Sequence, residues 1–204
     1  DVKGVGGHAV ADDLGVHARA TRACRLEFLE DEHARTFAGD KAVTLQVATG
    51  LHRPCTTAEL REMLGDALAS GLRIVQHDAR NAASDVDLGR TRAGGPILID
   101  RFFLESDLRL VTGLIEPHLM AGYSGGRKAV CPGLAAVETL RVAHGPALLE
   151  GHIGPGLVEG NPLHEALLEA VRRVGVHFML NVALDRERRI AGIFCGDIES
   201  AHAA

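Results

Sequence analysis

The chain has 204 residues, of which 46% are hydrophobic and 24% are charged. This length is enough for one α/β domain with its own core, and the composition excludes disordered and coiled-coil proteins. The formal net charge is -5, and acidic and basic residues are intermixed. We therefore expect no nucleic-acid partner. Since no apolar run approaches the roughly 18 residues that cross a bilayer, we expect no membrane partner and a cytoplasmic protein.

Periodicity divides the chain into two parts. Residues 1–41 show weak periodicity, with glycines and charges that fit no clear strand. We expect this part to be a poorly matched or truncated leader. Regular patterning begins at residue 42, and residues 42–204 are expected to form one domain.

From residue 43 onward the predicted strands and helices alternate. A β-rich run at 43–48 ends in Thr49-Gly50 and predicts a buried strand. Thr56 and Glu59 form a capping box at the start of a helix that Gly71 ends. The remaining patterns predict strands at 72–76, 97–99, 108–112, 178–184 and 190–194, and helices at 102–106, 135–143 and 162–174.

This alternation, with its short connections, predicts the fold class. We expect an α/β fold, a layered sheet that is mainly parallel or mixed, with helices on both faces. In such folds, sites lie at the carboxyl ends of strands. Two loops fall there, one after residue 48 and one after residue 112. We expect their side chains to converge on one crevice.

The first loop, TGLHRP, places an imidazole and a guanidinium directly beyond a strand. His52 is suited to proton transfer and Arg53 to anchoring an anion. The alternative is that His52 is a surface or capping residue.

The second loop, residues 113–128, combines His118 with a glycine-rich turn and two cations, Arg127 and Lys128. Exposed backbone N–H groups beside positive side chains are suited to a phosphate, but the spacing is not that of a P-loop. A Walker-type ATPase is therefore disfavoured. The alternative for this loop is a flexible surface turn whose cations are solvated.

Four ordered motifs resemble the nickel-pincer lactate racemase family. They are TGLHRP, GLIEPHLMAGYSGGRK, CPGLAAVETLRVAH and GNPLHEA, and the resemblance extends from Val43 to His202. It implies that residues 42–204 correspond to the cofactor-binding catalytic domain of the family, in an incomplete copy that lacks the second domain.

The resemblance also implies a cofactor. Lys128 matches the lysine that forms a covalent thioamide link to a nicotinic-acid-derived mononucleotide, the nickel-pincer nucleotide, whose sulfur and carbon atoms hold nickel. His144 matches the nickel ligand, and an imidazole suits nickel beside soft sulfur donors. The alternative for His144 is the polar end of a helix, where histidine is favoured electrostatically. Ser124, Gly125 and Gly126 are candidates for further cofactor contacts.

Two further histidines, His52 and His118, match the acid/base pair of the family. Such a pair takes the hydroxyl proton from either enantiomer of a 2-hydroxy acid while hydride passes from C2 to the cofactor ring. The implied function is racemisation or epimerisation of lactate or a related 2-hydroxy acid. The implied partners are this small substrate and the enzymes that build and load the cofactor.

Two other functions stay open. The family carries an upstream Asp-x-Thr-Arg-Pro motif, which residues 1–41 lack, since Thr21-Arg22-Ala23 is a poor substitute. The second hypothesis is therefore a non-catalytic, truncated family member that keeps only phosphate, metal or cofactor binding. The third hypothesis is a zinc hydrolase that uses His52, His118 and His144.

Overall fold

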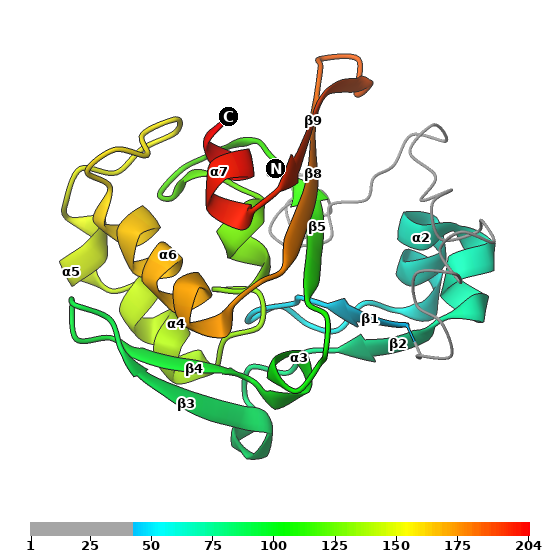
Figure 1. The fold of residues 1–204 in the computed structure, drawn as a ribbon, viewed down its shortest axis with the longest axis horizontal. Helices are drawn as coiled ribbons and strands as arrows, with labels where there is room; N and C mark the ends of the chain where they lie inside the picture. The colour runs from blue at the N-terminus through cyan, green and yellow to red at the C-terminus, as the bar shows by residue number, and fades with distance from the viewer. Residues whose placement is uncertain (1–42) are drawn as a thin grey trace, which may run out of the picture.

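The structure, a computed structural model, describes residues 43–204 (Figure 1). The leader expected at 1–41 lies outside the described residues. The strands are β1 (Thr44–Val47), β2 (Arg73–Gln76), β3 (Asp85–Arg90), β4 (Pro96–Asp100), β5 (Leu110–Leu114), β6 (Pro117–His118), β7 (Gly122–Tyr123), β8 (Phe178–Leu184) and β9 (Ile190–Gly196). The helices are α2 (Thr57–Gly71), α3 (Arg101–Leu104), α4 (Val137–Ala143), α5 (Pro146–Leu149), α6 (Pro162–Val174) and α7 (Ile198–Ala203), with 3-10 turns η2 (Ala82–Ser84) and η3 (Gly126–Ala129).

Within residues 43–204 the strands form small parallel and mixed sheets. β1 and β2 are parallel, as they must be when α2 crosses over between them. β8 is the middle strand of the mixed sheet, parallel to β5 and antiparallel to β9. Two antiparallel pairs, β3–β4 and β6–β7, complete the set. The predicted α/β class is confirmed.

The helices surround the mixed sheet unequally. In Figure 1, α4, α5 and α6 gather on one side of β5, β8 and β9, whereas α2 lies on the other side beside β1 and β2. α6 buries a stripe of residues that recur every three or four positions: Leu163, Ala166, Leu167, Ala170, Val171 and Val174. This stripe joins a core that includes Ile99, Val111 and Met179. Each large side chain buried there contributes about 1.5–3 kcal/mol of transfer free energy.

Local signals fix the ends of the two longest helices. Thr56 and Glu59 form the predicted capping box of α2. Asn161 caps α6, Pro162 occupies its first position, and Gly175 ends it in the left-handed conformation. These signals involve neighbours in the chain, which is why the sequence predicts both helices to within a residue or two.

Several elements are not predicted by the sequence patterns, among them β3 and α5. β3 carries Asp85, Asp87 and Arg90 and contains Gly89, so that its sequence has a weak strand pattern and it depends on pairing with β4. α5 is a single turn that begins at Pro146. None of the helices in residues 43–204 has the length and apolar character that a bilayer-crossing segment needs.

Candidate active site

The first loop leaves β1 and turns back on itself at once. Thr49 is buried and its Oγ1 donates to His77 O over 2.6 Å, while His52 N donates to Thr49 O over 3.0 Å. Gly50 has a φ of +53°, which only glycine adopts readily. This turn places the half-buried His52 just beyond the carboxyl end of the strand, as the sequence predicts.

A buried ion pair supports this turn from below. His77 Nδ1 lies 3.0 Å from Asp100 Oδ2, and His77 Nε2 lies 3.1 Å from Ala135 O. Burial alone would raise the pKa of Asp100, but the contact with His77 outweighs it and holds the pKa below its ordinary value. No sequence pattern predicts this pair, because its members come from distant segments.

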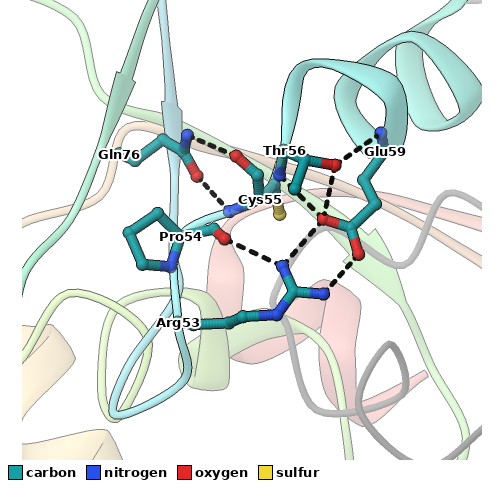
Figure 2. Close-up of polar contacts among 6 residues, drawn as sticks. All are labelled: Arg53, Pro54, Cys55, Thr56, Glu59 and Gln76. Atoms are coloured by element: carbon teal, nitrogen blue, oxygen red, sulfur yellow. Dashed lines mark hydrogen bonds and ion pairs between the residues drawn. The ribbon is translucent and has the colours of Figure 1, made fainter. Parts of the chain in front are cut away.

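The second half of the first loop is tied to α2 and β2 (Figure 2). The side-chain amide of Gln76 binds both backbone groups of Cys55. Its Oε1 accepts from Cys55 N over 2.6 Å, and its Nε2 donates to Cys55 O over 2.9 Å. Arg53 makes a bidentate pair with Glu59, with N–O distances of 2.8 and 2.5 Å. This pair lowers the pKa of Glu59 to about 2. The guanidinium predicted to anchor an anion is therefore engaged with Glu59.

The second loop is closed by Ser124. Its buried hydroxyl donates to Leu114 O and accepts from Glu116 N, both over 2.8 Å. Its backbone N–H donates to Glu116 O over the same distance. The side chain of Ser124 thus joins the two ends of the β6–β7 hairpin, a contact within the protein that the sequence does not predict.

His118 lies at the tip of this hairpin and is half-buried. Its Nδ1 accepts hydrogen bonds from Met120 N over 3.2 Å and from Ala121 N over 3.1 Å. A nitrogen that accepts carries no proton, so the neutral ring carries its proton on Nε2. The neutral ring of His118 therefore has its N–H donor at Nε2.

The two loops meet through main-chain atoms. Gly133 N donates to Lys128 O over 3.0 Å, and Gly133 O accepts from Gly50 N over 2.9 Å. Lys128 N in turn donates to Gly125 O over 3.0 Å. The loop of His52 and the segment of Lys128 are therefore joined through the main chain of Gly133.

Arg127 points into the protein instead of toward a ligand. It is 1% exposed, its Nη2 donates to Ala121 O and to Tyr123 O, and its Nη1 lies 3.0 Å from His202 Nε2. Burial lowers the pKa of Arg127 to about 10. Of the two cations predicted to suit a phosphate, Arg127 is thus buried and engaged with the protein itself.

Two histidines to which the sequence analysis assigns no role lie beside Arg127. The rings of His164 and His202 are 6.5 Å apart. Burial, followed by the charge of Arg127, lowers the pKa of both, for His164 to about 4. The sequence does hold one signal, because His164 shares the apolar stripe of α6 with Leu167 and Val171.

His144 lies at the end of α4, where the helix-end alternative places it. Its Nδ1 is 2.9 Å from Leu140 O and donates to it, which leaves Nε2 unprotonated. Metal-binding histidines are commonly held in this way by a backbone carbonyl. Among residues 43–204, no three His, Cys, Asp or Glu side chains are grouped so as to hold a metal ion. The three-histidine zinc site is therefore wrong.

Comparison with known proteins places these features in a family. The family model of the lactate racemase N-terminal domain matches residues 14–153. Lactate racemase of Lactiplantibacillus plantarum is 37% identical over 169 residues, which are 82% of this chain and 40% of that protein. Lactate racemase of Thermoanaerobacterium thermosaccharolyticum is 35% identical over 161 residues, which are 78% of this chain and 38% of that protein.

Solved structures give the same result. The lactate racemase apoprotein from Thermoanaerobacterium thermosaccharolyticum superimposes with a TM-score of 0.83 at 34% identity, over 87% of this chain and 43% of that chain. A protein from Thermotoga maritima superimposes with a TM-score of 0.70 at 22% identity, over 84% of this chain and 47% of that chain. It shares the fold. The chain spans about 40% of the length of the curated relatives it matches. Because the family model covers more than half of it, the chain belongs to the lactate racemase family.

Proposed function

We propose that this chain carries the cofactor-binding part of an enzyme that racemises or epimerises lactate or a related 2-hydroxy acid. The cofactor is a nickel-pincer nucleotide bound covalently through Lys128. The observation that supports this proposal best is the main-chain contact through Gly133, which joins the loop of His52 to the segment of Lys128. A proton-transfer group and a covalent attachment point are thereby held in one region.

The residues present fit such a cofactor. Its sulfur and carbon atoms need few ligands from the protein, and His144 supplies one through an unprotonated Nε2. Ser124, Gly125 and Gly126 lie directly before the lysine segment, and we propose that their backbone faces the nucleotide. When bound, the cofactor supplies the redox step at the substrate carbon, which protein side chains do not provide.

Proton transfer is the task of this chain's own residues. Inverting a 2-hydroxy acid requires a proton to leave the hydroxyl group of one enantiomer and return in the other. We assign His52 and His118 to these two faces. We propose that Nε2 is the atom of His118 that faces the substrate oxygen, because Nδ1 is engaged with two backbone N–H groups.

Mass spectrometry of the intact protein with metal analysis tests this assignment, after co-expression with enzymes that build and load the cofactor. The chain has three lysines, Lys3, Lys41 and Lys128, so the site of an added mass is easily mapped. We expect Lys128→Ala to abolish the added mass. We expect His144→Ala to keep the mass and lose nickel.

The exposed His152 provides a matched control, because His152→Ala removes an imidazole that has no assigned role in the proposed site. This variant should retain both mass and nickel. Equal loading of the Lys128→Ala and His144→Ala variants would contradict both assignments. A folded wild-type chain with neither mass nor metal would favour the non-catalytic alternative. We place the enzyme in the cytoplasm, where the loading enzymes must meet it.

A further inference from the structure

Asn161 is a helix cap that does more than capping requires. It is 0% exposed, and its Oδ1 accepts from Leu163 N over 3.0 Å and His164 N over 3.1 Å. Its Nδ2 donates to Met120 O over 2.8 Å and to Leu157 O over 2.9 Å. Asp, Ser and Thr cap helices comparably through an oxygen. Only the two donor bonds explain why an amide stands here.

One of these donor bonds reaches a peptide unit that holds His118. The carbonyl of Met120 and the N–H of Ala121 belong to the same planar unit and point in opposite directions. The oxygen of this unit accepts from Asn161, and its N–H donates to His118 Nδ1 over 3.1 Å. Asn161 and the imidazole therefore hold one rigid group from its two sides.

This arrangement connects α6 to His118 through consecutive hydrogen bonds. A carbonyl that accepts a hydrogen bond makes the N–H of its own peptide a better donor. A fixed donor at Nδ1 keeps the proton of neutral His118 on Nε2 and fixes the plane of the ring. Figure 1 shows α6 within the group of helices at one side of the mixed sheet, so the relay begins in a packed element.

We propose that Asn161 is a positioning residue, which orients His118 through the Met120–Ala121 peptide. Its importance for catalysis rests on the proposed function, because that function gives His118 its role. The hydrogen-bond relay itself does not depend on that function, and it can be measured in the chain without cofactor or substrate.

Amide hydrogen exchange in the ¹⁵N-labelled chain at neutral pH tests the relay. Asn161→Asp keeps the capping oxygen and the shape but removes the donor. We expect exchange at Ala121 to accelerate at least about tenfold, because a buried carbonyl loses its donor. Exchange at Leu163 and His164 should stay within about twofold, because aspartate caps as well as asparagine. Equal acceleration at all three amides would overturn the proposal.

A matched control makes the reverse substitution at another helix. Asp197 caps α7 by accepting from Glu199 N and Ser200 N, so Asp197→Asn keeps an acceptor there. It should leave exchange at Ala121 unchanged. If Asn161→Asp fails to fold, Asn161→Ser offers a shorter cap, and the wild-type chain offers a direct test. A scalar coupling between Ala121 N and His118 Nδ1 is expected, and its absence would overturn the proposal.

Kinetics of the loaded enzyme test the consequence for catalysis. We expect Asn161→Asp to lower kcat at least about tenfold and to leave KM within about threefold, since the ring and not the substrate is displaced. Cofactor mass and nickel content should match wild type. A changed KM with unchanged kcat overturns the positioning role. An inactive wild-type enzyme with intact Ala121 protection instead counts against the proposed function alone.

Discussion

At the scale of single residues, packing within the fold explains why glycines stand in the second loop. A Cβ at Gly125 would lie 2.5 Å from Asn181 Nδ2 and 2.9 Å from Leu114 O. A Cβ at Gly126 would lie 2.5 Å from His202 Cδ2. The proposed cofactor contacts of these glycines thus coincide with a packing requirement. Packing of this kind is not predictable from the sequence, since its partners come from β8 and α7.

Gly125→Ala should accordingly destabilise the protein more than an alanine in open space. Gly125 has a φ of +69° and close neighbours, whereas Gly94 has a φ of +83° and nothing within 4 Å. We expect Gly94→Ala to cost about 1 kcal/mol of backbone strain. Gly125→Ala adds overpacking of about 2 kcal/mol. Urea unfolding measures both, and equal losses would contradict the packing argument.

Site residues differ in how far the sequence identifies them. Motif resemblance singles out His52, His118, Lys128 and His144, because each lies within a long ordered pattern. It does not reveal that Arg53 pairs with Glu59 or that Arg127 is buried. Charged side chains are mostly exposed, so the sequence alone predicts a solvated side chain. The partners of Arg53 and Arg127 are known only from the tertiary structure.

At the scale of elements, predictability follows the range of the interactions. The caps of α2 and α6 depend on residues within one turn, so the sequence locates them. β3 depends on β4, and its register is shifted between Asp87 and Arg90, so that no simple alternation marks it. The β6–β7 pair has two residues in each strand and arises from the closure of the loop by Ser124.

The capping box of α2 gives a prediction at this scale. Thr56 Oγ1 accepts from Glu59 N, whereas the adjacent Thr57 is the first helical residue and is exposed. We expect Thr56→Ala to destabilise the first turn by about 1 kcal/mol. The amides of this turn should then exchange roughly fivefold faster. Thr57→Ala makes the same chemical change without removing the cap. Identical exchange in the two variants would show that the box contributes nothing.

At the scale of the whole molecule, three basic groups lie close together, of which two are buried and His202 is half-buried. Arg127, His164 and His202 come from η3, α6 and α7, and burial lowers the pKa of each. The folded state therefore favours neutral histidines at this point. His202 Nε2 also lies 2.8 Å from Ser124 O, so α7 contacts the second loop at this point.

Global stability should fall on mild acidification. The pKa of His164 is about 4 in the folded state against an ordinary value of 6.5, so the unfolded chain binds an additional proton between these values. Stability is complete above pH 6.5 and declines toward pH 4, by about 1.4 kcal/mol per pH unit for this group. Urea unfolding from about pH 7.5 to about pH 5 should therefore show a shallower decline in His164→Gln. Parallel declines in the two proteins would contradict the assignment.

The main-chain contact from Gly50 through Gly133 to Lys128 has a consequence for sequence divergence. Its atoms are amide nitrogens and carbonyl oxygens, which every residue type provides except for the missing N–H of proline. Side-chain substitutions elsewhere in both loops leave these atoms in place. Such a joint tolerates substitution of its neighbours but not of its two glycines, since Gly50 has a φ of +53° and a Cβ at Gly133 would clash with Ala129 O.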